Sequence, residues 1–230
     1  MSVSRRTGWL FLGLSLVACT GTETGNPPFD GDSYTSAPLV ASTDPADEPS
    51  VLVDQVFVSF AGVRVLSGEV CARVSTEQGA EGRVASLLAG ASLGELPATD
   101  DACGVRVELA VAEAADDVPE SLVGAMIWIH GERADGAPVE IRIASIEAWE
   151  LRAPAPFVLR EGTILALDLA TLVENAAVLD AAPDPDGVVR LDELAAGSAV
   201  LAASGLFADV DEDGRISDPD RASGDLAHHD

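Results

Sequence analysis

Acidic side chains near the C-terminus have the spacing of a calcium-binding loop. Asp209, Asp211 and Asp213 alternate along the chain and Gly214 follows them. Calcium takes six to eight hard oxygen ligands, and a twelve-residue loop supplies them from positions 1, 3, 5, 7 and 12, with a glycine turn at position 6. Calcium is therefore the predicted cofactor, and the predicted ligands are the carboxylates of Asp209, Asp211, Asp213 and Asp220 and the backbone carbonyl of Arg215.

A second, incomplete copy of this pattern lies upstream. When Gly187 is aligned with position 6, Asp184 and Asp186 fall at positions 3 and 5 and Glu193 falls at position 12. Ala182 leaves position 1 without a side-chain ligand, so we expect a weaker site here. The alternative for both segments is a solvated acidic tail in which the Asp-Gly spacing is a coincidence.

The loop at 209–220 resembles the calcium loops of EF-hand proteins. Only one helix, expected over Leu194 to Ala203, fits between the two loops, which excludes a calmodulin-like pair of EF-hands. The arrangement is closer to the minimal loops of dockerins and extracellular structural modules. The resemblance implies weak, structural calcium affinity, in roughly the millimolar range. It also leaves docking of a partner through the loops as an alternative role.

The N-terminus has the pattern of a secretion signal that ends at a cysteine. Arg5 and Arg6 precede a short apolar stretch over residues 8–18, and Cys19 follows small residues. This resembles the lipobox of bacterial lipoproteins, which implies removal of residues 1–18 and acylation of Cys19. Acyl chains would anchor the chain to a membrane. The alternative is an ordinary signal peptide with an incidental cysteine.

Residues 19–50 are predicted to form a lipidated, disordered tether. They are rich in Thr, Ser, Gly, Pro and Asp and cannot bury enough apolar surface to offset the entropy of the chain. Thr20 after the cysteine favours the outer membrane of a Gram-negative bacterium over the inner membrane. The segment at 21–27 resembles the tether of myxobacterial-type lipoproteins. We therefore expect a cell-envelope location, most specifically the outer membrane.

Residues 51–173 are predicted to form an antiparallel β-sandwich. Val105, Val107 and Leu109 alternate with polar residues at the period of two that is typical of strands. Asp135-Gly136 separates two apolar runs, as expected for a hairpin turn. The predicted fold class is mainly β, with a short helical and calcium-loop-containing C-terminal segment over 174–230.

Two cysteines remain after Cys19, and both lie in this β-domain. Cys71 and Cys103 form an even pair in a compartment expected to be oxidising, so we predict a disulfide between them. The alternative is two buried free thiols.

Residues 51–173 also resemble an uncharacterised family of bacterial surface lipoprotein domains. The similar segments are "QVFVSFAGVRV" at 55–65, "LLAGASLGELPA" at 87–98 and "VRVELA" at 105–110. The resemblance implies a β-sandwich of carbohydrate-module-like or transthyretin-like type without known chemistry. The family's "G-x-Y" after the turn is replaced here by Asp100-Asp101-Ala102-Cys103.

Charge and motifs restrict the function further. The net charge is −26 with 13 basic and 39 acidic residues, which disfavours binding to nucleic acids. The sequence contains no nucleophile elbow, metalloprotease helix or phosphate-binding loop. We therefore expect a non-catalytic binding or structural module with an envelope protein or a glycan as ligand. The alternative is a glycan-acting hydrolase that uses a carboxylate pair such as Glu147 and Glu150, with Trp128 and Trp149 stacking on sugars.

Overall fold

The structure is a computed structural model, and it describes most of the chain after residue 33. The described ranges are 34–42, 51–68, 70–75, 83–88, 91–97, 99–146, 149–159, 163–210 and 218–229. Cys19 lies outside them, so the predicted lipid attachment lies outside the described residues. Within these ranges, no helix is both long and apolar enough to cross a bilayer.

Thirteen strands and three short helices make up the described fold. In chain order they are β1 (Tyr34–Ser42), β2 (Val51–Ser67), β3 (Arg73–Val74), β4 (Arg83–Ser86), β5 (Ala91–Pro97), β6 (Thr99–Leu109), β7 (Ile127–Arg133), β8 (Pro138–Ile143), β9 (Trp149–Leu159), β10 (Thr163–Asp168), α1 (Leu169–Asn175), β11 (Val189–Arg190), α2 (Glu193–Ala202), β12 (Ser204–Ala208), α3 (Asp218–Ser223) and β13 (Asp225–His228). The prediction of a mainly β fold with a short helical segment near the C-terminus is confirmed.

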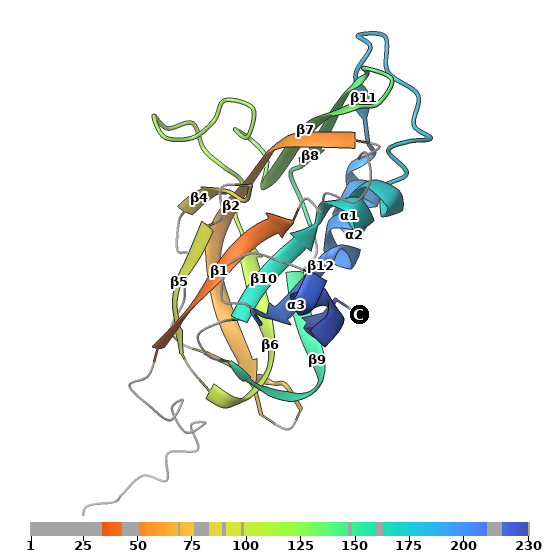
Figure 1. The fold of residues 1–230 in the computed structure, drawn as a ribbon. Helices are drawn as coiled ribbons and strands as arrows, with labels where there is room; N and C mark the ends of the chain where they lie inside the picture. Colours follow the sequence, from red (N-terminus) through yellow and green to blue (C-terminus); the bar gives the residue numbers. More distant parts are fainter. Residues whose placement is uncertain are drawn as a thin grey trace, which may run out of the picture.

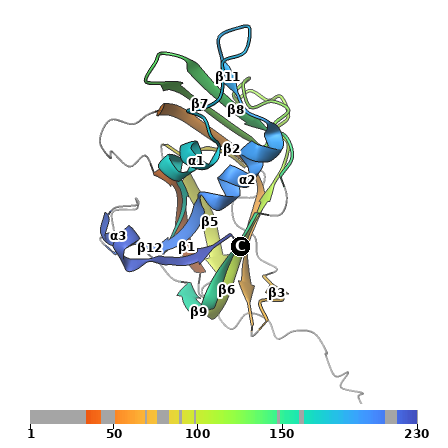
Figure 2. The ribbon, with the colours of Figure 1, turned by 90° about the vertical axis from the view of Figure 1, so that its right-hand side faces the viewer.

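The described strands belong to one continuous curled sheet. Its order is β11-β8-β7-β2-β6-β9-β13-β12-β10-β1-β5, and β3 and β4 pair with β2 outside this path. Most neighbours are antiparallel, but β1 runs parallel to β10 and β11 runs parallel to β8. The two layers expected of a sandwich are thus two halves of the same sheet, and α1 and α2 lie together along one side of it (Figures 1 and 2).

The largest cluster of buried apolar residues joins the two halves of the sheet. Val105 and Val107 of β6 pack in the same cluster as Leu165 and Leu167 of β10. The polar positions between the β6 valines point the other way, where Arg106 contacts Glu150 and Arg64 contacts Glu108. The period of two in β6 therefore predicted its buried face correctly, because alternate side chains of a strand lie on opposite faces. In β10 both faces are buried, since Ile164 and Ala166 belong to a second apolar cluster.

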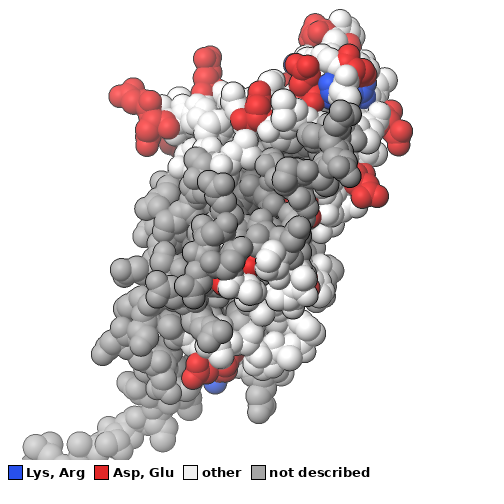
Figure 3. Space-filling view, in the orientation of Figure 1, with Lys and Arg blue, Asp and Glu red and all other residues white. Residues whose placement is uncertain are grey.

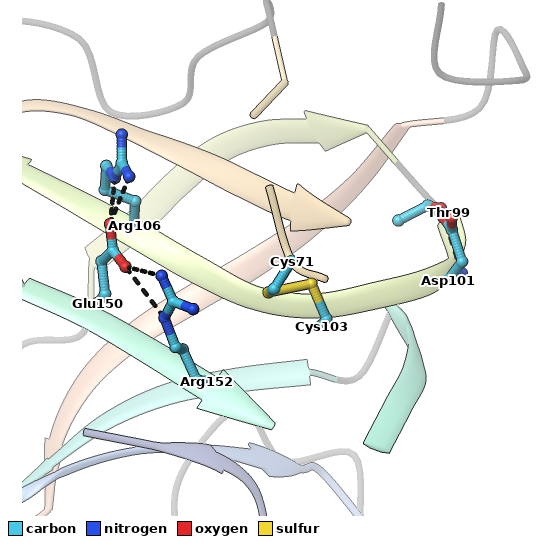
Figure 4. Close-up of a disulfide and its surroundings, with 7 residues drawn as sticks. All are labelled: Cys71, Thr99, Asp101, Cys103, Arg106, Glu150 and Arg152. Atoms are coloured by element: carbon cyan, nitrogen blue, oxygen red, sulfur yellow. Dashed lines mark hydrogen bonds and ion pairs between the residues drawn. A yellow bond between two sulfur atoms is a disulfide. The ribbon is translucent and has the colours of Figure 1, made fainter. Parts of the chain in front are cut away.

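The predicted hairpin and the predicted disulfide are both confirmed. Strands β7 and β8 pair antiparallel around the Asp135-Gly136 turn, in which Gly136 has a φ of 83°. That left-handed conformation is one that glycine adopts without strain. The sulfur atoms of Cys71 and Cys103 are bonded, and the two Cα atoms are 5.7 Å apart (Figure 4).

Two of the expected segment boundaries need correction. Tyr34–Ser42, predicted to be part of the tether, forms strand β1 between β10 and β5. The segment from 174 to 230, predicted to be an acidic helical tail with calcium loops outside the β-domain, supplies β11, β12 and β13 to the sheet. Strands β12 and β13 lie between β10 and β9, so the C-terminal segment is a central part of the β-domain.

Candidate metal centre

The loop predicted to bind calcium connects β12 to β13. These strands pair antiparallel, with Gly205 opposite His228 and Leu206 opposite Ala227. Asp209 follows β12 directly, and α3 lies just before β13. The predicted loop therefore lies between two paired strands of the sheet, β12 before it and β13 after it. Helix α3 lies between the loop and β13 (Figure 2).

Asp220 at position 12 of the loop lies close to the loop's beginning. Its side chain is fully buried, and its Oδ1 accepts a hydrogen bond of 2.6 Å from the backbone N–H of Val210. The Ser223 hydroxyl donates to the Asp220 carbonyl within α3. The structure thus brings positions 2 and 12 of the loop together. The other predicted ligands, Asp211, Asp213 and Arg215, lie outside the described residues.

The upstream segment has the backbone shape expected of such a loop. Gly187, at position 6, has a φ of 82°. Val189, at position 8, is buried and pairs with Val139 of β8. Asp192 caps the N-terminus of α2 by accepting from the N–H groups of Leu194 and Ala195, so the helix begins at position 12. A turn, a short strand and a helix therefore follow one another at the predicted positions.

An arginine lies among the carboxylates of this upstream loop. Asp184 accepts backbone hydrogen bonds from Asp186 and Val188, and its other oxygen pairs with the guanidinium of Arg190. The same guanidinium lies 3.8 Å from Asp186 and 2.9 Å from Glu140 of β8. Arg190 thus supplies positive charge to the loop and links it to the sheet (arginine presents several N–H donors in a fixed plane).

Glu193 is directed away from the two aspartates. Its Oε1 accepts from the backbone N–H groups of Ala144 and Ser145, at 2.7 and 2.6 Å. These contacts hold the start of α2 against the segment that follows β8. The structure therefore brings Asp184 and Asp186 to Arg190 and does not bring Glu193 to them. In the described ranges, no group of three or more His, Cys, Asp or Glu side chains converges as metal ligands do.

The pKa values in this region follow from these contacts. Burial by itself would raise the pKa of Asp184, but the N–H groups of Val188 and Asp186 and the charge of Arg190 outweigh it, so the pKa of Asp184 lies below its ordinary value. The N–H groups of Ser145 and Ala144 likewise lower the pKa of Glu193. Both carboxylates are therefore stabilised in the charged form by neighbouring protein groups.

We expect Asp184→Ala to lower the melting temperature at neutral pH by roughly a few degrees, because three donors lose their acceptor. Asp186→Ala is the matched control and should change it little, since that side chain is 81% exposed. Because the folded pKa of Asp184 is depressed, its contribution is present above the unfolded value of about 3.9 and is lost as the pH falls below it. Melting curves from pH 3 to 7 would measure this difference.

The same melting curves, repeated with calcium and with a chelator, show which cation balances the carboxylates of the upstream loop. If that cation is Arg190, Asp184→Ala lowers the melting temperature by the same amount in both conditions. An effect that appears only when calcium is present would contradict this account and would assign a second ion to 182–193.

Of the carboxylate pair and tryptophans considered for glycan hydrolysis, Glu150, Trp149 and Trp128 are described. Glu150 lies between the guanidinium groups of Arg106 and Arg152, which lower its pKa against the opposing effect of burial (Figure 4). Trp149 is 1% exposed and belongs to the main core. Glu147, the other carboxylate of the suggested pair, lies outside the described residues.

Trp128 is also largely covered. It stacks with Phe57 and with His130, with ring centroids 6.0 and 5.7 Å away, and it is 7% exposed. Its indole N–H donates to Glu140, which lowers the pKa of that carboxyl group. The Nδ1 atom of His130 lies 2.7 Å from Asp54. With 7% of its surface exposed, the side chain offers little area for stacking on a sugar.

Sequence reasoning missed Arg190, although a signal for it was present. Arg190 occupies position 9 of the incomplete loop, where the downstream loop has Ser217. A basic residue in a calcium-like loop that lacks one acidic ligand indicates that an internal cation balances the remaining carboxylates.

Comparison of the chain with models of known protein families, with curated proteins and with solved structures finds no match.

Proposed function

We propose that the chain is a lipid-anchored cell-envelope protein whose non-catalytic β-domain is stabilised by calcium at residues 209–220. The anchor is assigned to Cys19, by the arginines, the apolar stretch and the small residues that precede it. In this proposal the folded domain acts as a binding or structural module on the outer membrane, with an envelope protein or a glycan as its ligand.

The observation that supports the calcium assignment is the spacing of the acidic residues, together with the position of Asp220 beside the beginning of the loop. Asp220 lies at position 12, beside the backbone of position 2, in a segment that also contains Asp209, Asp211 and Asp213. Carboxylates at these positions repel one another unless a cation lies among them, and hard oxygen donors favour calcium.

Calcium is expected to raise the melting temperature of the mature chain. At a calcium concentration about tenfold above a millimolar dissociation constant, the stabilisation is about 1.4 kcal/mol, which corresponds to about 3–6 °C for a domain of this size. Asp209→Asn should abolish the shift, because it removes the charge of the position 1 ligand.

Asp186→Asn is the matched control for this experiment, since it removes one acidic charge from the upstream loop and should leave the shift unchanged. Isothermal titration of the wild-type chain should give one ion per molecule. The absence of both heat and a thermal shift at about 10 mM calcium would exclude the calcium assignment.

A further inference from the structure

The seventeen-residue strand β2 runs between two opposite ends of the β-domain. At its start, Val51 pairs with Arg133, next to the turn at Asp135. At its finish, Ser67 pairs with Ala102, next to the Cys71–Cys103 disulfide. We call the end with Val51 and the β7–β8 turn the distal end, and the end with the disulfide and the start of β6 the anchor end.

Strand β1 begins at the anchor end. Tyr34, its first residue, pairs with Pro97, the last residue of β5. Thr99 then begins β6, whose course leads past Asp101 to the disulfide (Figure 4). Figure 1 shows the same relation, with β1 starting at the lower end of the domain and the β7–β8 hairpin at the upper end.

The distance from Cys19 to the sheet is limited by the length of the chain. Residues 20–33 separate Cys19 from Tyr34, which is 33 − 19 = 14 residues. A fully extended chain of this length spans at most about 50 Å, whatever its conformation. The start of the sheet at Tyr34 limits this distance, because a tether that continued to residue 50 would span about twice as far.

We propose that the mature protein stands on the lipid surface with its anchor end toward the headgroups and its distal end turned away from them. This inference rests on the proposed acylation of Cys19. The attachment through Tyr34 keeps the anchor end near the bilayer, and β2 separates the distal end from it by up to about 55 Å more. Exposed acids of the distal end, such as Glu132 of β7, then face the aqueous phase. Figure 3 shows acidic side chains at this upper end of the domain.

Energy transfer to labelled lipid tests this orientation. Asp100→Cys places a dye at the anchor end, and Glu132→Cys places one at the distal end; both positions are exposed acids in strands, so the two variants are matched. Because Cys71 and Cys103 are paired and Cys19 is acylated, each variant has one free thiol. The lipidated chain is reconstituted into phosphatidylethanolamine–phosphatidylglycerol vesicles that contain an acceptor dye on the headgroup.

We expect transfer from position 100 to exceed transfer from position 132 by about twofold or more, and we expect a long Gly-Ser insertion after Pro28 to reduce this ratio. Equal transfer from the two positions, or stronger transfer from position 132, would overturn the orientation alone. Mass spectrometry of the N-terminal peptide decides the anchor separately: a chain without acyl groups on Cys19 would overturn the proposed anchor and the orientation together.

Discussion

Ala227→Asp is expected to destabilise the folded chain by roughly 3–5 kcal/mol, because it places an unpaired charge in the core. Ala227 is fully buried in the main apolar cluster, opposite Leu206 of β12. Urea denaturation followed by tryptophan fluorescence would measure the loss. Ala222→Asp is the matched control, since the same change at an exposed position of α3 should alter stability by less than about 0.5 kcal/mol.

The size of this expected effect reflects the place of β13 in the sheet. Strand β13 lies between β12 and β9 and so connects the half of the sheet that contains β2, β6 and β9 to the half that contains β10, β1 and β5. Its pairing with β9 is limited to His228 opposite Arg152. If Ala227→Asp and Ala222→Asp destabilised the chain by similar amounts, the result would contradict the central role of β13 in the sheet. It would instead indicate that the chain is generally sensitive to added negative charge.

Removal of the disulfide is expected to cost roughly 3–4 kcal/mol of folding stability. Cys71 and Cys103 are 32 residues apart, and a cross-link of that separation restricts the unfolded chain by about this amount. The variant Cys71→Ala/Cys103→Ala, compared with the wild-type chain by chemical denaturation, would measure the difference.

A reductant provides the control for the disulfide variant. It should destabilise the wild-type chain by a similar amount and leave the double alanine variant unchanged, because only the wild-type chain has a bond to reduce. A loss below about 1 kcal/mol in both measurements would show that the disulfide contributes little to stability.

Local patterns in the sequence determined several elements correctly. The β7–β8 hairpin follows from two apolar runs around Asp135-Gly136, since this turn forms from a few adjacent residues. Helix α2 was expected over Leu194 to Ala203 and is found at Glu193–Ala202. The cysteine pairing follows from parity, because two cysteines allow only one intramolecular bond.

The calcium site at 209–220 stays a prediction, and several contacts in the acidic segments could not be predicted from the sequence. Asp209 and Asp220 follow from the spacing of the loop, and the structure places Asp220 beside Val210. The pairing of Glu193 with the backbone of Ala144 depends on how α2 packs against the segment after β8. The pairing of Arg190 with Glu140 depends on the alignment of β11 with β8. The sequence alone does not show whether a given carboxylate binds an ion, an arginine or a backbone amide.

The β-rich class, the β7–β8 hairpin, helix α2 and the cysteine pair could be predicted from the sequence, because each depends on neighbouring residues or on residue counts. The order of the strands could not, because it depends on pairing between segments that are distant in the chain. Tyr34–Ser42 has the composition of a linker, and β13 has only four residues, so neither carries a periodic signal. Both segments form strands because neighbouring strands offer hydrogen-bonding partners to their backbones, and those partners are distant in the chain.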